Sequence, residues 1–126
     1  MKKLKFVVPL YDIDVTLLQV EGKEDEEAVL DECKQYNISE EIEEELRDSI
    51  SNEYSDGAST FWNSGLHVAV IVFYRMKSAQ RKCVCYSHEK RHLEDRILEF
   101  CGIDDREAAA YLAGFLSQYF DELRFQ

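Results

Sequence analysis

The residues in this sequence with the clearest potential for chemistry are two histidines in the segment His88-Glu89-Lys90-Arg91-His92. On an α-helix, residues four apart lie one turn above the other on the same face. Both imidazoles would then be available to one Zn²⁺ ion, with Glu89 beside them. A catalytic zinc of this kind needs a third protein ligand and a water molecule, from which the carboxylate takes a proton. The spacing therefore predicts a hydrolytic zinc centre on a helix.

The same five residues have a second interpretation. Lys90 and Arg91 stand between Glu89 and His92, where zinc peptidases usually carry uncharged residues. Helical spacing directs both cationic side chains away from the histidine face and into solvent. The competing interpretation is a basic surface helix whose histidines bind nothing.

Length and charge limit the classes of function. A chain of 126 residues with 45% hydrophobic residues is long enough for one folded domain and too short for two. Its net charge is −11, and residues 21–56 carry fifteen acidic against three basic residues. Such an acidic segment repels a phosphate backbone, so nucleic-acid binding is not expected. Residues 75–96 carry seven basic against three acidic residues, which predicts either a solvated helix face or a patch that attracts an acidic partner.

No pattern indicates secretion or membrane insertion. The basic start of the chain is followed by an apolar run that Pro9 interrupts and Asp12 ends, too short for a signal peptide or a membrane span. The cysteines have neither disulfide-framework nor zinc-ribbon spacing: Cys33, Cys83, Cys85 and Cys101. We therefore expect reduced thiols in a cytoplasmic protein without a membrane partner, while the sequence indicates no oligomeric state.

The first half of the chain predicts a hairpin followed by two acidic helices. Residues 4–10 and 13–20 are rich in Val, Leu and aromatic residues and predict two paired strands. Residues 24–36 carry apolar residues at helical spacing. Asn37, with Glu40 three residues later, predicts a capping box that opens the second helix.

The second half predicts strands and then a helix pair. A strand is expected at residues 59–62, and the sequence LHVAVIVFY at 66–74 predicts the strongest strand, inside the sheet. His67 at its start is a candidate metal ligand, a candidate oxyanion donor or a packing residue. A helix at residues 82–101 should end at Gly102 as a left-handed cap.

The last helix is expected to start at Asp104 as N-cap and to run to about residue 123. Together these elements predict an α+β domain over residues 1–126, with a small, largely antiparallel sheet and acidic scaffold helices in residues 1–81. Residues 82–126 would form the metal-binding helix pair.

A longer pattern extends the histidine motif. The segment 88–92 is followed by Ile97-Leu98, by Gly102-Ile103 and by the run from Glu107 to Leu116, EAAAYLAGFL. Over residues 84–120 this pattern resembles the small zincin-like metallopeptidases encoded by bacteriophages, prophages and mobile elements. In that family the H-E-x-x-H helix is followed closely by a helix that carries a Glu and a Tyr.

The resemblance implies that Glu107 is the third zinc ligand, as in gluzincins, and that Tyr111 is an oxyanion donor. From the residues alone, Glu107 is equally a capping partner of Asp104, and Tyr111 is equally a core residue. Glu107 would meet His92 only if the two helices cross steeply or the first helix ends before Cys101, since a tight antiparallel hairpin keeps them apart.

Two functions are therefore expected. The first is a zinc-dependent hydrolase of peptide or protein substrates, with His88, His92 and Glu107 as ligands and Glu89 as general base. The alternative is a non-enzymatic, acidic interaction protein of a mobile element with an inactive zincin-like fold. A tight hairpin with Glu107 distant from His92 would favour the alternative.

Overall fold

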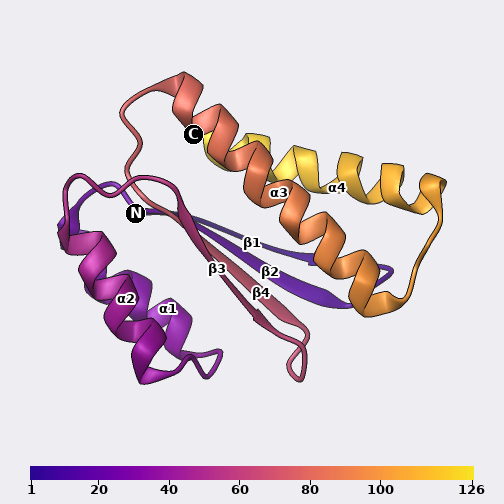
Figure 1. The fold of residues 1–126 in the computed structure, drawn as a ribbon, viewed down its shortest axis with the longest axis horizontal. Helices are drawn as coiled ribbons and strands as arrows, with labels where there is room; N and C mark the ends of the chain where they lie inside the picture. Colours follow the sequence, from indigo (N-terminus) through magenta and orange to yellow (C-terminus); the bar gives the residue numbers. More distant parts are fainter.

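A four-stranded sheet lies between two pairs of helices in the computed structural model, which describes residues 1–126 (Figure 1). The strands are β1 (Lys2–Val8), β2 (Ile13–Gln19), β3 (Ala58–Asn63) and β4 (Val68–Phe73). The helices are the 3-10 turn η1 (Lys23–Asp25), α1 (Glu26–Lys34), α2 (Glu40–Ser51), α3 (Ala79–Cys101) and α4 (Arg106–Arg124). This α+β architecture was predicted from the sequence.

The sheet is mixed, with the strand order β1-β2-β4-β3. The two outer pairings are antiparallel, as predicted, whereas the central strands β2 and β4 run parallel. Helices cover both faces at the centre, so every residue of β4 is buried. This explains the unbroken apolar run that predicted a strand inside the sheet.

The same order of elements occurs twice along the chain. A hairpin, β1–β2 or β3–β4, is followed each time by a helix pair, α1–α2 or α3–α4. In Figure 1 the first helix pair lies on one side of the strands and the second pair on the other. In topology, the two halves are thus related by a two-fold rotation about a line along the strands, between β2 and β4.

Successive side chains of each strand point to opposite faces of the sheet, so the apolar side chains form one core on each face. The core under α3 and α4 joins residues of β2 and β4 to both helices, including Leu17, Ile71, Leu93 and Leu116. The core under α1 and α2 joins the alternate strand residues to the acidic helices, including Leu18, Val70, Leu30 and Leu46.

A buried polar contact fixes α3 on the sheet. The side-chain amide of Gln19 donates hydrogen bonds to the carbonyls of Val20, Phe73 and Tyr74, at the end of the central strand pair. Its carbonyl oxygen accepts a hydrogen bond from the Tyr86 hydroxyl of α3. Burial raises the pKa of Tyr86, so the hydroxyl keeps the proton that it donates.

Two N-caps differ from the prediction. Asn37 does not cap α2, because its backbone is left-handed at φ 57° and forms a turn. Ser39 takes that role, and its hydroxyl accepts a hydrogen bond from the Ile42 amide at 3.2 Å.

At α4, Asp105 rather than Asp104 is the N-cap, and its carboxylate accepts from the Glu107 amide at 2.8 Å. The sequence offers neighbouring residues with equal capping chemistry, so only backbone geometry selects one. The predicted end of α3 was correct, since Gly102 ends it at φ 66°, whereas the helix starts at Ala79, before the predicted start at residue 82. None of the helices combines the length and the apolar composition that crossing a bilayer requires.

Candidate functional site

The structure brings His88 and His92 together on one face of α3. Both side chains are exposed, and their Nε2 atoms are 3.0 Å apart. One neutral imidazole can donate a hydrogen bond to the other at this distance, depending on the tautomers. Two adjacent ring nitrogens of this kind are also two candidate metal donors.

The other predicted site residues lie elsewhere. Glu107 and Tyr111, both exposed on α4, line a hollow with Ala110, Gly114 and Phe115. The two histidines line a different hollow, which α3 forms alone. Tyr111 is 77% exposed, so the interpretation of Tyr111 as a core residue was wrong. No three His, Cys, Asp or Glu side chains are placed to hold one metal ion, so the predicted three-ligand set is not assembled.

The packing of α3 against α4 accounts for this separation. Lys90 Nζ lies 3.2 Å from Glu94 Oε2 and donates to the Ala113 carbonyl of α4 at 3.4 Å. That side of α3 therefore faces α4. His88 and His92 are each two residues from Lys90, or about 160° around the helix, so they face away from α4.

The expectation that Lys90 is solvated was therefore wrong. Its ammonium neutralises Glu94, which is only 6% exposed between the helices. Arg91 is exposed, as expected, and pairs with Asp95 at 3.2 Å. The two cationic residues within the motif thus have different roles, and Lys90 has a structural one.

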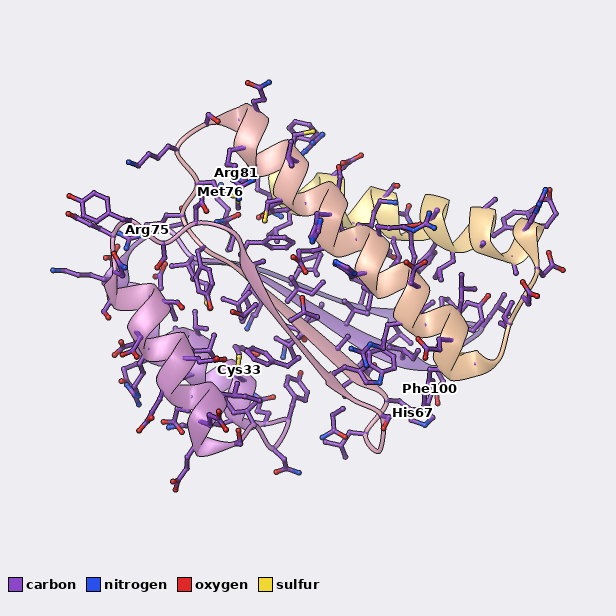
Figure 2. All side chains as sticks on the ribbon, viewed as in Figure 1. Cys33, His67, Arg75, Met76, Arg81 and Phe100 are labelled. Atoms are coloured by element: carbon purple, nitrogen blue, oxygen red, sulfur yellow. The ribbon has the colours of Figure 1, made fainter.

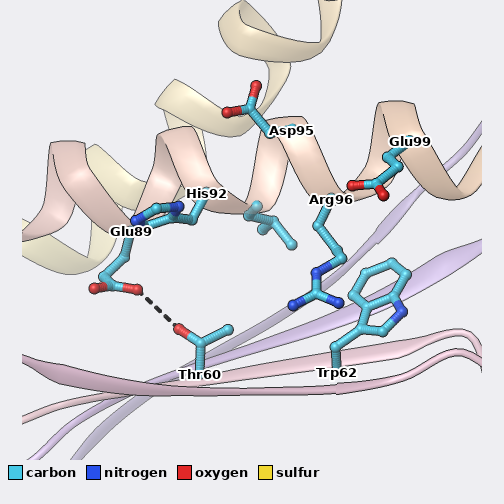
Figure 3. Close-up of a pocket in the computed structure, with 8 residues that line it drawn as sticks. Thr60, Trp62, Glu89, His92, Asp95, Arg96 and Glu99 are labelled. Carbon is cyan, nitrogen blue, oxygen red and sulfur yellow. Dashed lines mark hydrogen bonds between the residues drawn. The ribbon is translucent and has the colours of Figure 1, made fainter.

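Glu89 faces the sheet. Its Oε2 accepts a hydrogen bond of 2.9 Å from the Thr60 hydroxyl on β3 (Figure 3). With His92 it lines a hollow of about 460 Å³ between α3 and β3. We name this space the acidic hollow and list its lining: Thr60, Trp62, Glu89, His92, Leu93, Asp95, Arg96 and Glu99.

An aromatic ring and opposed charges meet in the acidic hollow. Glu89 and Arg96 extend from α3 toward β3, and Trp62 extends from β3 toward α3, whereas Asp95 points away (Figure 3). The Arg96 guanidinium carbon lies 6.0 Å from the centre of the Trp62 ring, within the range of a cation–π contact. Asp95 is paired with Arg91, so Glu89 and Glu99 against the Arg96 guanidinium leave the hollow negatively charged.

A second hollow lies on the other face of β3. Its cavity volume is about 200 Å³, and we name it the apolar hollow because most of its lining residues are hydrophobic. They include Ile38, Ile42, Phe61, Val68 and Val70. Thr60 and Trp62 line both hollows, so the same stretch of β3 separates them.

The sequence did not predict these two hollows. The available signal was the alternation in β3, where Thr60 and Trp62 point to one face and Phe61 points to the other. The side that α3 would occupy, however, depends on the topology of the sheet.

His67 has a packing role. It precedes β4 with a left-handed backbone at φ 54°. Its ring lies edge-on to Phe100, with centroids 5.3 Å apart, and the two are neighbours in Figure 2. Phe100 also contacts Trp62, with centroids 5.5 Å apart. These contacts correspond to the packing interpretation of His67.

The buried thiols are unreactive near neutral pH. Burial raises the pKa of Cys33 to about 12 and the pKa of Cys85 to about 11. Both thiols therefore stay protonated near neutral pH, and a protonated thiol is neither a good nucleophile nor a good metal ligand. All four cysteines are free, and Cys83 is the exposed one.

Comparison of the chain with protein-family models, curated proteins and solved structures found no match. The residues with chemical potential are brought together by the geometry of α3 and β3. That geometry offers a histidine pair without a third metal ligand, and an acidic hollow that contains the tryptophan.

Proposed function

We propose that this chain is a non-catalytic protein that binds a basic segment of another protein in the acidic hollow. The observation that carries the proposal is that Trp62, Glu89 and Glu99 line one space of about 460 Å³. Glu89 stands over Thr60 at one end of this space, and Trp62 lies beneath Arg96 at the other end (Figure 3). An aromatic face with nearby carboxylates suits a Lys or Arg side chain, whose stem packs on the ring while its charge reaches an acid.

The present partners of the carboxylates in the acidic hollow support a cationic ligand. Asp95 is already paired with Arg91, whereas Glu89 binds the neutral Thr60 hydroxyl. A ligand ammonium would give Glu89 a charged partner in place of a neutral one. The net charge of −11 would also attract a basic partner from a distance.

Features of α3 favour binding over catalysis. The gluzincin-type reaction needs three metal ligands, and Glu107 lines another hollow than the histidine pair. The residues present therefore do not fit a complete zinc site. Glu89, the expected general base, is engaged by Thr60 instead of being directed to the histidine pair.

A fluorescence titration tests the proposal, because Trp62 is the only tryptophan and lines the hollow. Pentalysine should change its emission saturably, and pentaglutamate should not. We expect the double variant Glu89→Gln/Glu99→Gln to weaken pentalysine binding by about tenfold, or about 1.4 kcal/mol.

The matched control is Glu40→Gln/Glu44→Gln, which removes the same charge from exposed positions of α2. It should weaken binding much less. Equal weakening in both double variants would mean that net charge alone attracts the peptide, and the proposed site would be wrong. The absence of saturable binding to the wild type would also refute it.

A zinc-dependent peptidase is the second candidate, favoured by the 3.0 Å approach of the two imidazoles. Elemental analysis of untagged protein, purified without added metal, tests it beside His92→Ala and Glu107→Ala. Near one zinc per chain that both variants lose would support the peptidase. Zinc lost in His92→Ala and kept in Glu107→Ala would indicate a two-histidine site without the gluzincin ligand. No zinc in the wild type, even after zinc is supplied, would exclude this candidate.

A further inference from the structure

β3 is an edge strand whose outer backbone groups have no strand partner. It pairs only with β4, and the Tyr74 amide donates to the Gly57 carbonyl at 2.9 Å in the same register. In an antiparallel pair, residues that bond to the neighbouring strand alternate with residues that do not. Counting from Gly57, the amides and carbonyls of Ala58, Thr60 and Trp62 therefore point away from β4.

These outward backbone groups lie between the two hollows. Thr60 and Trp62 line both the acidic hollow, toward α3, and the apolar hollow, toward α2. A strand added at this edge would send successive side chains to opposite faces. One set of its side chains would therefore enter the acidic hollow and the alternate set the apolar hollow.

We propose that β3 binds an extended partner segment as a fifth strand of the sheet, in which basic and apolar residues alternate. The inference rests on the proposed function and specifies the conformation and the pattern of the partner. Backbone hydrogen bonds to Thr60 and Trp62 supply sequence-independent binding, and the two hollows supply specificity. The basic residues reach Glu89 and Glu99, while the apolar residues contact Ile42 and Phe61.

Charge argues for a separate partner over a second copy of this chain. The folded chain has one other edge strand, β1, which carries Lys2, Lys3 and Lys5. Lys3 and Lys5 already bind the Glu32 carboxylate, at 2.7 Å and 2.9 Å, and Lys2 donates to the Gln126 carbonyl. A second copy would therefore offer from this edge only lysines that are already engaged within their own chain.

The test compares two substitutions at one residue. Thr60→Pro removes the outward amide and leaves the amides that bond to β4 untouched, since proline is tolerated where a strand amide faces solvent. Thr60→Val removes the hydroxyl and keeps the amide, so it controls for the lost bond to Glu89. Circular dichroism checks that both variants are folded.

The probes are two blocked pentapeptides of equal composition, one alternating lysine with valine and the other with its three lysines contiguous. By Trp62 fluorescence, the alternating peptide should bind the wild type and Thr60→Val at least about tenfold more tightly than the contiguous one. Thr60→Pro should lose that difference. Hydrogen exchange of the wild-type Thr60 and Trp62 amides should slow with the alternating peptide, a readout that needs no folded proline variant.

The contrary outcomes separate the two proposals. Equal binding of both peptides, without amide protection at Thr60 and Trp62, would refute strand pairing and leave the acidic hollow as a binding site. Failure of both peptides to bind would refute both proposals. A wild-type dimer in sedimentation that Thr60→Pro abolishes, and that the alternating peptide does not displace, would identify a second copy as the occupant and overturn the proposed partner.

Discussion

The two edge strands of the sheet, β1 and β3, have the same place in their hairpins and different surroundings. Each pairs with one neighbour only. At β1, Lys3 and Lys5 bind Glu32 of α1 on one face, and Phe6 stacks on Tyr119 of α4 at 4.1 Å on the other. At β3, by contrast, a hollow lies on each face.

Covering helices, and not only strand composition, therefore decide whether an edge is available. Helices of both layers reach β1, and its lysines further protect the edge against pairing, a common feature of natural edge strands. α3 contacts β3 through the Thr60–Glu89 bond and through the contacts of Trp62 with Arg96 and Phe100, and it leaves the acidic hollow between them. The repeated topology of the two halves therefore produces one closed edge and one open edge.

The largest expected effect comes from removing one aromatic ring at each edge. Phe6 is 8% exposed and stacked, so Phe6→Ala should lower the free energy of unfolding by about 3 kcal/mol. Trp62 is half-buried beside two hollows, so Trp62→Ala should cost only about 1 kcal/mol. Urea denaturation followed by circular dichroism measures both. Similar losses in the two variants would mean that β3 is packed as closely as β1.

An intermediate effect is expected from the lysines of β1. Hydrogen bonds from Lys3 and Lys5 lower the pKa of the Glu32 carboxyl below its ordinary value of 4.5, against the opposing effect of burial. The double variant Lys3→Ala/Lys5→Ala should lose about 1 kcal/mol at pH 7, because both lysines are half-exposed.

The sign of the pH dependence follows from the lowered pKa. The stabilisation by Glu32 is fully present above pH 4.5 and is lost as the pH falls through the lower, folded-state pKa. The gap in stability between wild type and double variant should therefore shrink toward pH 3 in urea denaturation. A gap that stays constant from pH 7 to pH 3 would show that the lysines act through packing alone.

The smallest effect is expected at β3. Thr60→Val removes the hydroxyl that donates to Glu89, an exposed bond, so the free energy of unfolding should change by no more than about 0.5 kcal/mol. The same urea measurement would detect a larger loss. Such a loss would mean that the Thr60–Glu89 bond fixes α3 to β3 and that the edge is less open than proposed.

Local patterns in the sequence determined much of the fold. The apolar run before Tyr74, the β1–β2 hairpin and the Gly102 cap each depend on a few neighbouring residues, and each was predicted. The spacing of His88 and His92 likewise depends only on the helix that carries them. Local patterns did not determine which of two neighbouring residues of equal chemistry, such as Asp104 and Asp105, caps a helix.

Tertiary structure alone decided the arrangement around α3. The parallel pairing of β2 with β4 and the placement of the two helix pairs on opposite faces are both long-range features that no local pattern encodes. The partly buried Lys90–Glu94 pair lies on the side of α3 that faces α4, which leaves the histidines facing away from Glu107. The sequence thus specified which side chains share a helix face, whereas long-range packing decided what each face meets.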